Sequence, residues 1–331
     1  AFAEFQGVKH AIATTNGTTA LTTALFAAGI EPGDEVIIPS FSFIATATSI
    51  LSANAVPVFV DVEPETFCMD PDLVVEAITP KTKAIMPVHL YGQPANMPAL
   101  NEIAQQYNLK IIEDAAQAHG AKIDDVGVGG WGAAGFSFYA TKNMTSGEGG
   151  MVTTNDDEIA ALARMVRNHG MNKQYYHEVV GFNFRMTNII AAIGLAQMSN
   201  IGEWNKKRIE NAAYFNEHIQ SVKTPVIRDG YHHVFHQYTV VVPEDADRDA
   251  MIEQLNKRGI GARVYYPLPI HCQPIFSQNR QAGNTCSCGH GLDCPHLPVS
   301  TRLSKQVFSL PVHPALTQED LERIVYEVNA L

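Results

Sequence analysis

Three features of the sequence could together do chemistry on an amine. Lys142 ends an apolar run, FSFYATK, where the run gives way to a glycine-rich turn. Asp114 ends a second apolar run, KIIED, directly after Glu113. The segment TTNGTTAL, residues 14–21, opens a helix from a small polar turn. A lysine amine can form a Schiff base, an acid can pair with a cation, and the free N–H groups at a helix start bind anions.

Each feature also has an ordinary structural interpretation. An isolated lysine is usually a solvated surface group, and Asn16 or Thr18 could simply cap the helix. An acid after a buried strand could cap a helix, or hold a metal, a ribose or a protonated ring nitrogen. Taken together, the lysine, the aspartate and the helix start are the parts that a pyridoxal phosphate (PLP) site requires, although the residues alone do not prove that grouping.

Composition limits the classes of protein to which the chain can belong. It has 331 residues, 46% apolar and 17% charged, which is typical of a globular protein with a substantial core. The net charge of −11, with no basic run, argues against nucleic acid or an anionic membrane as a partner, but leaves a small anionic ligand possible. The sequence shows no membrane-spanning run and no signal peptide. Five cysteines are too few for a disulfide framework, so we expect a cytoplasmic protein.

The elements that must position these residues follow an alternating pattern. Between about residues 17 and 154, helical segments alternate with short apolar runs rich in β-branched residues. The pattern predicts an α/β fold with a mainly parallel sheet covered on both faces. The predicted strands are DEVIIPS, VPVFVDV, AIMPVHLYG, LKIIEDAA, FSFYATK and GGMVTTND. Ligands of such sheets bind beyond the carboxyl ends of the strands, where Asp114, Ser137 and Lys142 lie in the sequence.

A second, smaller α/β domain is predicted after residue 200. A long polar helix, EWNKKRIENAAYFNEHI, begins there and is followed by YTVVVP, RDAMIEQLNKRGI, ARVYYP and a final helix, TQEDLERIVYEVNAL. We therefore predict a large domain over residues 1–200 and a small C-terminal domain over 201–331. The chain opens on AFAEFQGVKH, without Met and with an amphipathic helix already under way, so we expect further residues upstream.

The segment GVGGWG, residues 127–132, matches the glycine pattern of dinucleotide-binding proteins. That pattern binds a dinucleotide when a strand precedes it and a helix follows it. Here KIDD precedes the glycines and an apolar run, GFSFYA, follows. We interpret the segment as a flexible turn and do not expect a nicotinamide dehydrogenase.

Ordered motifs along nearly the whole chain resemble those of a known family. They are NGTTAL, GDEVIIPSFSFIATA, VPVFVDVEPETF, KAIMPVHLYGQPA, IIEDAAQAHGA, FSFYATKN with GEGGMV, RNHG, GFNFRM and SLPVHP. The chain resembles the sugar aminotransferases of the DegT/DnrJ/EryC1/StrS group, which are fold-type I PLP enzymes. The resemblance implies that fold, with PLP as cofactor, and a homodimer whose active site lies at the subunit interface.

The resemblance also implies roles for individual residues. Lys142 would bind PLP covalently and move the proton between cofactor and substrate carbons, and Asp114 would keep the pyridine nitrogen protonated. Phe43 would stack on the ring and Gln117 would approach the ring's 3-oxygen. Asn183 would reach the phosphate bound by the other subunit. The residues expected to hold the phosphate within one subunit are Thr18, Thr19 and Ser137. Further candidates, which could support the site from behind, face the substrate or be purely structural, are His89, His119, His169, Arg185 and His313.

The implied reaction is a transamination. Relatives that dehydrate sugars at C3 carry a histidine in place of this lysine, so Lys142 favours transamination. L-glutamate (or glutamine) would convert PLP to pyridoxamine phosphate, and a keto sugar linked to a nucleotide diphosphate would then take the amine in a ping-pong cycle. The alternatives are a cyclitol or aminoshikimate-type acceptor on the same fold, or a PLP-binding regulator without turnover.

One segment departs from the family pattern. CSCGHGLDCPH, residues 286–296, places three cysteines and two histidines close together, as in some zinc sites. The spacing differs from the common C-x-x-C pairs, which favours an ordinary insertion over a metal site. The zinc hypothesis names Cys286, Cys288, His290, Cys294 and His296.

Overall fold

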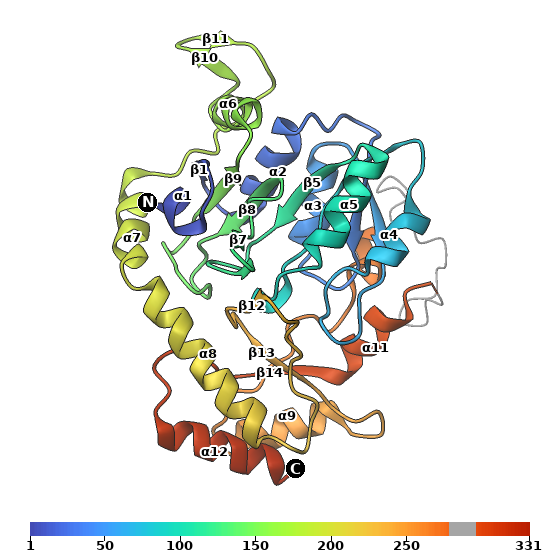
Figure 1. Ribbon diagram of the computed structural model, residues 1–331, viewed down its shortest axis with the longest axis vertical. Coiled ribbons are helices and arrows are strands. Elements are labelled where there is room, and N and C mark those ends of the chain that lie inside the picture. Colours follow the sequence, from blue (N-terminus) through green and yellow to red (C-terminus); the bar gives the residue numbers. More distant parts are fainter. Residues whose placement is uncertain (278–295) are drawn as a thin grey trace.

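A seven-stranded sheet forms the centre of the computed structural model, which describes residues 1–277 and 296–331 (Figure 1). The strand order is β1-β9-β8-β5-β4-β2-β3. The neighbours among β2, β3, β4, β5 and β8 pair in parallel, whereas β9 is antiparallel to both β8 and β1. The predicted mainly parallel α/β sheet is therefore confirmed. Its strands are β1 (His10–Thr14), β2 (Glu35–Pro39), β3 (Val56–Val60), β4 (Thr82–Ile85), β5 (Lys110–Asp114), β8 (Ala133–Ser137) and β9 (Gly150–Thr154).

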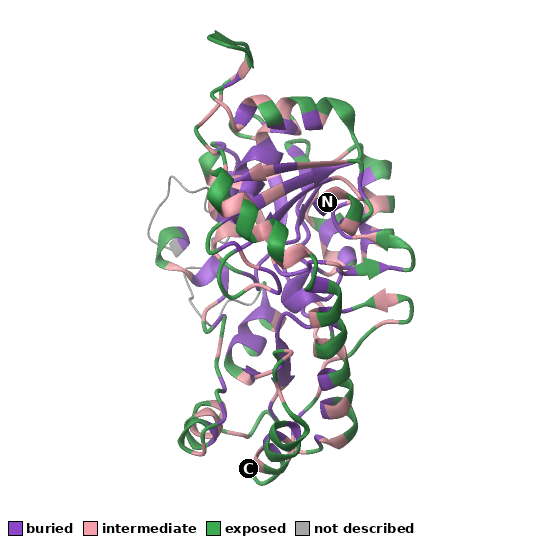
Figure 2. Cartoon of the chain, turned by 90° about the vertical axis from the view of Figure 1, so that its left-hand side faces the viewer, coloured by how far each residue is buried: buried purple, intermediate pink, exposed green. Residues whose placement is uncertain are grey.

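Helices cover this sheet, and Figure 2 shows its strands as the buried centre of the molecule. Several of the helices begin at the capping residues that the sequence supplies. Asn16 caps α2 in a capping box with Thr19, and Asp70, Asn96 and Asp156 cap α4, α5 and α6. The helices of this part are α1 (Phe2–Gln6), α2 (Gly17–Ala27), α3 (Ala45–Ser52), α4 (Pro71–Ala77), α5 (Met97–Tyr107), α6 (Asp157–Val166) and α7 (Asn188–Met198).

The C-terminal part has a core of its own below the sheet in Figure 1. Strand β13 (Tyr238–Val241) pairs antiparallel with β14 (Val307–Leu310), and buried Phe215, Tyr238 and Phe308 join α8 to this pair. Tyr266 and Leu303, in contrast, pack into a core shared with β2 and β4. The helices are α8 (Ile201–His218), α9 (Arg248–Lys257), α10 (Pro274–Ser277), α11 (Pro298–Gln306) and α12 (Gln318–Asn329).

Short elements connect these parts. Strand β6 pairs antiparallel with β7 and with β12, and the β10–β11 hairpin projects from the molecule, as Figures 1 and 2 show. Their bounds are β6 (Lys122–Ile123), β7 (Val126–Gly127), β10 (Met171–Lys173), β11 (Tyr176–His177), β12 (Tyr231–His232) and the 3₁₀ turns η1 (Leu90–Gly92) and η2 (Ile270–Cys272).

Two predicted strands were wrong in part, and one segment of the predicted small domain forms no strand. Strand β8 ends at Ser137, and Lys142 lies in the turn that follows. Strand β4 ends at Ile85, because Pro87 has no N–H to continue the hydrogen-bond ladder, and the chain then forms η1. ARVYYP makes only an isolated bridge, between Arg263 and Ser309.

The glycine segment at 127–132 is a turn between β7 and β8, and a strand follows it as expected. No helix in the described residues is long and apolar enough to span a membrane. Cys286, Cys288, His290 and Cys294 of the zinc hypothesis lie outside the described residues, and only His296 lies within them. Within the described ranges, no group of three or more His, Cys, Asp or Glu side chains could hold a metal.

Candidate active site

A cavity of about 610 Å³ opens where the carboxyl ends of β5 and β8 meet the start of α2. Strands β5 and β8 pair in parallel with Asp114 opposite Gly135, so their carboxyl ends lie at the same edge of the sheet. Most of the residues predicted to bind the cofactor line this cavity: Thr18, Thr19, Phe43, Asp114, Gln117, Ser137 and Lys142. The sheet and α2 therefore bring together side chains that are far apart in the sequence.

Asp114 is buried at the end of β5 and keeps unused acceptor capacity. Thr46 Oγ1 donates to its Oδ2 at 2.7 Å, and the Ala116 N–H donates to its Oδ1 at 3.2 Å. Burial raises the pKa of the Asp114 carboxyl, and these two donors and the nearby Lys142 only partly offset that effect. A buried carboxylate in this state would gain from a cationic ligand with an N–H donor.

Lys142 faces the same cavity from the turn after β8, where its backbone N–H donates to the Tyr139 carbonyl at 3.0 Å. Burial lowers the pKa of the Lys142 ammonium to about 8, and the charge of Asp114 acts in the opposite direction. An amine with this pKa is partly neutral near physiological pH, as a nucleophilic amine must be.

The start of α2 forms a small polar wall of the cavity. Asn16 Oδ1 accepts from the Thr19 N–H at 2.9 Å, and Thr19 Oγ1 donates to the Asn16 carbonyl at 2.9 Å. Gly17 lies so close to Ser137 that a Cβ at Gly17 would come within 2.7 Å of the Ser137 Cβ. The exposed Thr18 hydroxyl and the free N–H groups of this 11-residue helix therefore lie beside Ser137 and can hold an anion.

Gln117 and Phe43 border the cavity in different ways. Gln117 Nε2 donates to the Tyr266 hydroxyl at 2.7 Å, and its Oε1 accepts from the Tyr91 N–H at 2.8 Å. This pair of bonds fixes the amide and leaves one N–H for a ligand. Phe43 is 57% exposed, which is unusual for a large apolar side chain and leaves its ring free to cover a planar ligand.

Sequence reasoning missed several residues that line or support the cavity. Thr46, the hydroxyl donor to Asp114, lies within the family motif FSFIATA and could have been found there. The C-terminal part contributes His236, Gln237, Tyr265 and Tyr266, for which the sequence offers no chemical pattern. Their positions depend on how the C-terminal part packs on the sheet.

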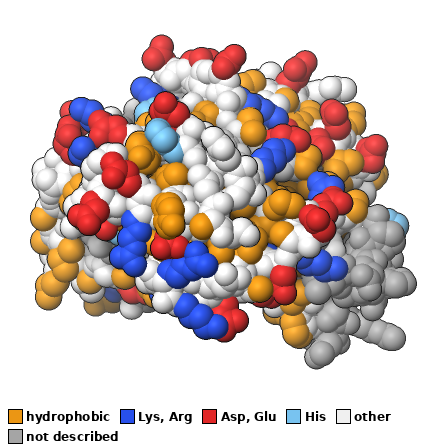
Figure 3. Space-filling view, turned by 90° about the horizontal axis from the view of Figure 1, so that it is seen from below, with side chains coloured by type: hydrophobic (Ala, Val, Ile, Leu, Met, Phe, Trp, Pro, Cys, Tyr) orange, Lys and Arg blue, Asp and Glu red, His pale blue; other side chains and the backbone are white. Residues whose placement is uncertain are grey.

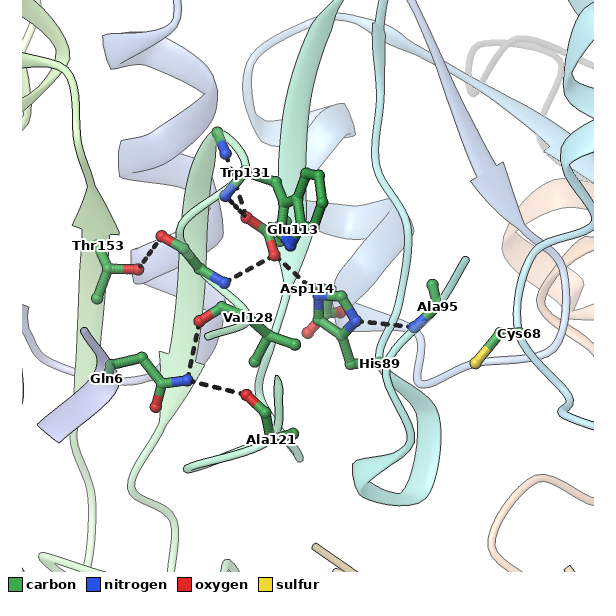
Figure 4. Close-up of polar contacts among 12 residues, drawn as sticks. Gln6, Cys68, His89, Ala95, Glu113, Asp114, Ala121, Val128, Trp131 and Thr153 are labelled. Atoms are coloured by element: carbon green, nitrogen blue, oxygen red, sulfur yellow. Dashed lines mark hydrogen bonds and ion pairs between the residues drawn. The ribbon is translucent and has the colours of Figure 1, made fainter. Parts of the chain in front are cut away.

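Glu113, the neighbour of Asp114, does not line the cavity and has a different set of partners (Figure 4). The backbone N–H groups of Gly129, Trp131 and Gly132 donate to its carboxylate at 2.7, 3.0 and 3.2 Å. His89 Nε2 lies 3.0 Å from the same carboxylate, and the His89 Nδ1 accepts from the Ala95 N–H at 3.0 Å. The glycine-rich turn thus binds an internal carboxylate rather than a dinucleotide.

The other predicted residues lie away from the cavity. Asn183 is exposed and belongs to a segment that bridges Asn168. Arg185 donates to Asn168 Oδ1 at 2.6 Å in the same region. His119 is buried against Phe136 and Phe138, and burial lowers the pKa of its imidazole to about 3. His169 also lies outside the cavity lining, whereas His313 lines a second cavity, beside the first.

Comparison with known proteins places this geometry in a family. The DegT/DnrJ/EryC1/StrS aminotransferase family matches residues 1–329. The "Pleiotropic regulatory protein" of Geobacillus stearothermophilus is 44% identical over 98% of this chain and 86% of its own length. The enzyme named UDP-N-acetyl-3-dehydro-alpha-D-glucosamine 3-aminotransferase, from Acidithiobacillus ferrooxidans, is 42% identical over 97% of this chain and 84% of its own length.

A solved structure agrees with the sequence relatives. DesV of S. venezuelae, in complex with a ketimine intermediate, superposes with a TM-score of 0.91 at 38% identity, covering 99% of this chain and 86% of DesV. Enzymes of this family depend on PLP, and the cavity described above carries the lysine, the acid and the helix start that such a cofactor requires. The chain therefore belongs to the DegT/DnrJ/EryC1/StrS aminotransferase family and is an aminotransferase of fold type I.

Proposed function

We propose that the chain transfers the amino group of L-glutamate, or of glutamine, to a keto sugar linked to a nucleotide diphosphate. The observation that supports this proposal most directly is that Lys142, Asp114 and the start of α2 line the same cavity. Several relatives are named for sugars linked to UDP, GDP or dTDP, and these names support this acceptor class. The amino donor becomes a 2-oxo acid in one half-reaction, and the keto oxygen of the sugar leaves as water in the other.

The residues present fit PLP. Asp114 supplies a buried carboxylate with spare acceptor capacity for a pyridinium N–H, and Thr18 and Ser137 would hold the phosphate at the start of α2. The N–H and hydroxyl of Thr19 both donate to Asn16, so the phosphate role predicted for Thr19 would require its hydroxyl to turn away from Asn16. Phe43 would cover the ring, and the remaining N–H of Gln117 would donate to the 3-oxygen. When bound, the cofactor would supply an aldehyde carbon that carries the amino group and a ring that withdraws electrons.

Lys142 has two tasks in this proposal. Its amine holds the cofactor between turnovers, and its Nζ takes the proton from the substrate carbon and returns it. The lowered pKa of about 8 suits a group that must gain and lose a proton near neutral pH. Asp114 keeps its negative charge toward the ring nitrogen, which makes proton removal by Lys142 easier.

We also propose a homodimer in which Asn183 reaches the phosphate site of the partner subunit. Helix α7 supports this proposal, because none of its residues is buried although most are apolar. Ile189 and Leu195 are 75% and 60% exposed. An exposed apolar helix beside Asn183 is typical of a surface that pairs with a second chain.

A mixed-dimer experiment tests the shared site. Lys142→Ala and Asn183→Asp variants are each expected to be weakly active or inactive alone. If one subunit supplies Lys142 and the other Asn183, mixed dimers contain one intact site, and activity returns on subunit exchange. Failure to regain activity in dimers shown to be mixed would remove Asn183 from the partner's site.

The central test is spectroscopic. We expect the purified protein to show the absorbance of lysine-bound PLP and to lose that band when L-glutamate is added. A panel of UDP-, GDP- and dTDP-linked keto sugars, with cyclitol and aminoshikimate-type ketones for comparison, should restore it. Restoration by a ring ketone but by no nucleotide sugar would favour the alternative acceptor class.

A second candidate function is regulation through PLP binding. The name of the Geobacillus relative, "Pleiotropic regulatory protein", favours it. It predicts that PLP binds but that the band is unchanged by amino donors. The presence of Lys142, Asp114 and Gln117 in one cavity favours catalysis instead.

A further inference from the structure

A second cavity, of about 560 Å³, adjoins the cavity around Lys142 on the side of the C-terminal part. Thr141, His236, Gln237 and Tyr265 line both cavities, so the two share a wall beside the catalytic lysine. The volume is in the range of small-molecule sites. None of the residues proposed above to bind PLP lines the part of this second cavity that lies away from Lys142.

The side chains of this second cavity are rich in positive charge. Arg208, Arg263, Arg323 and His313 line it, and Asp320 is the one carboxylate among its described lining residues. The Asp320 carboxylate is already used, because it accepts from the Thr317 N–H at 2.9 Å and from the Thr317 hydroxyl at 2.7 Å. The cavity therefore has an excess of cations, although the chain as a whole carries −11 and Figure 3 shows charges of both signs interspersed on the end of the molecule formed by α8, α9 and α12.

Arg208 is the most unusual of these groups. It extends from α8, and its Nη1 donates to the carbonyls of Phe235 and His236 at 3.2 and 3.4 Å. Among the described residues no carboxylate forms an ion pair with it, and its buried Nε has no hydrogen-bond partner. Burial lowers the pKa of its guanidinium to about 10. A partly buried cation without a counter-charge is costly, and a bound anion would offset that cost.

Arg263 adds a second, unpaired cation. It lies on an extended segment that forms an isolated bridge with Ser309. Within the described ranges, its exposed side chain forms no ion pair or hydrogen bond. Arg323, in contrast, already donates to the Arg258 carbonyl at 2.6 Å. Arg208 also donates to carbonyls, but its buried Nε has no partner, so Arg208 and Arg263 are the two guanidinium groups that we assign to a ligand.

We infer that this second cavity binds an anionic oxygen group of a substrate, held by Arg208 and Arg263, while the reacting carbon lies at Lys142. The inference rests on the proposed function, since the anion belongs to one of the two substrates. It is either the diphosphate of the nucleotide sugar or the distal carboxylate of the amino donor. Arginine forms paired hydrogen bonds with both kinds of group.

The test uses two probes on the PLP-loaded protein, pyrophosphate for the sugar nucleotide and glutarate for the donor. Calorimetry is expected to show that one probe binds, and that Arg208→Gln weakens it by about tenfold to a hundredfold. The KM of the matching substrate should rise by a similar factor with a smaller change in kcat, and Arg208→Lys should recover part of the loss. Pyrophosphate binding assigns the cavity to the diphosphate, and glutarate binding assigns it to the donor.

Two further variants separate this inference from a folding effect. Arg263→Gln changes an exposed side chain and should weaken the same probe by about threefold to tenfold. Arg302→Gln makes the same charge change on α11, outside both cavities, and should leave binding unchanged. If neither probe binds, or if Arg208→Gln and Arg263→Gln bind as tightly as the wild type, the inference is overturned. Failure of the proposed function is distinct, because the wild type would then lack transamination whatever its anion binding.

Discussion

Glu113 and Asp114 are consecutive acids at the end of one strand, yet their surroundings are opposite. Glu113 accepts three backbone N–H groups of the glycine-rich turn and pairs with His89. Asp114 receives one hydroxyl and one N–H, and its pKa is raised by burial. Successive side chains of a strand point to opposite faces of a sheet, so one residue step separates the two environments.

The comparison shows how a structural acid differs from one available for catalysis. A carboxylate whose acceptor sites are occupied by the protein stabilises the fold and has little left for a ligand. Asp114 is buried with fewer donors, so its charge remains available to a cationic ring. The same contrast holds among the cations, where Arg228 pairs with Glu63 but the described residues give Arg208 no acid.

The largest expected effect is a loss of activity on substitution of Lys142, which lines the first cavity. Lys142→Ala removes the amine that we propose to hold the cofactor and move the proton, so transamination should fall below detection while the protein stays folded. Coupled assay of 2-oxo acid release, with circular dichroism as the folding control, measures both. Turnover by this variant would show that another lysine is the nucleophile.

Asp114→Asn should lower kcat by about 10²–10³-fold, because in the proposed function the ring nitrogen would lose its charge partner. Stability should be unchanged or slightly higher, since a desolvated carboxylate is replaced by a neutral amide. Steady-state kinetics and thermal unfolding of the same preparation measure the two effects. Activity close to the wild-type level would exclude Asp114 from this role.

Glu113→Gln should produce the opposite pattern. It removes a charged acceptor from three N–H groups and His89, so we expect unfolding to become easier by about 2–4 kcal/mol. The loss of kcat in the folded variant should be smaller than that of Asp114→Asn. Denaturant titration checks the prediction. The control is Glu210→Gln, which breaks the exposed pair with Lys207 and should change the free energy of unfolding by no more than about 0.5 kcal/mol. Equal kinetic effects of the two acid variants would contradict the division of roles.

The lowered pKa of Lys142 predicts a pH dependence of cofactor uptake. The rate at which protein freed of PLP takes it up should rise with pH and level off above about 8, because the neutral amine is the reactive form. Asp114→Asn should move this midpoint downward, since the charge of Asp114 raises the lysine pKa. Stopped-flow absorbance follows the reaction, with the free amine of N-acetyl-lysine as the reference. A midpoint near 10.5, the ordinary lysine value, would contradict burial of the amine.

The smallest expected effect is on the pH dependence of stability. Because the pKa of Asp114 is raised in the folded protein, its protonated form favours folding below an unfolded pKa of about 3.9, and this contribution is lost as pH rises through the folded value. The PLP-free Asp114→Asn variant has no carboxyl at this position, so it does not lose this part of its stability as the pH rises. Its stability relative to the wild type should therefore increase from pH 4 toward neutrality. A difference that does not vary with pH would mean that Asp114 is solvated.

The sequence by itself determined the sheet class and the family, and seven of the eight residues that it predicts to bind the cofactor line one cavity. Alternating strands and helices with capping residues such as Asn16 and Asp156 encode local structure directly, and ordered motifs placed Lys142 and Asp114 in one site. These features are local, because caps and strand patterns depend on residues only a few positions apart. Strand ends were less accurate, since Pro87 and the turn before Lys142 changed them.

Only the tertiary structure decided which polar groups are satisfied and which are available. Glu113 and Asp114 look equivalent in the sequence, and their difference depends on a turn at residues 129–132 and on Thr46. Tyr266, His236 and Arg208 enter the two cavities only because the C-terminal part packs against the sheet. Burial and pairing are sums over contacts between segments far apart in the chain, and no local pattern contains them.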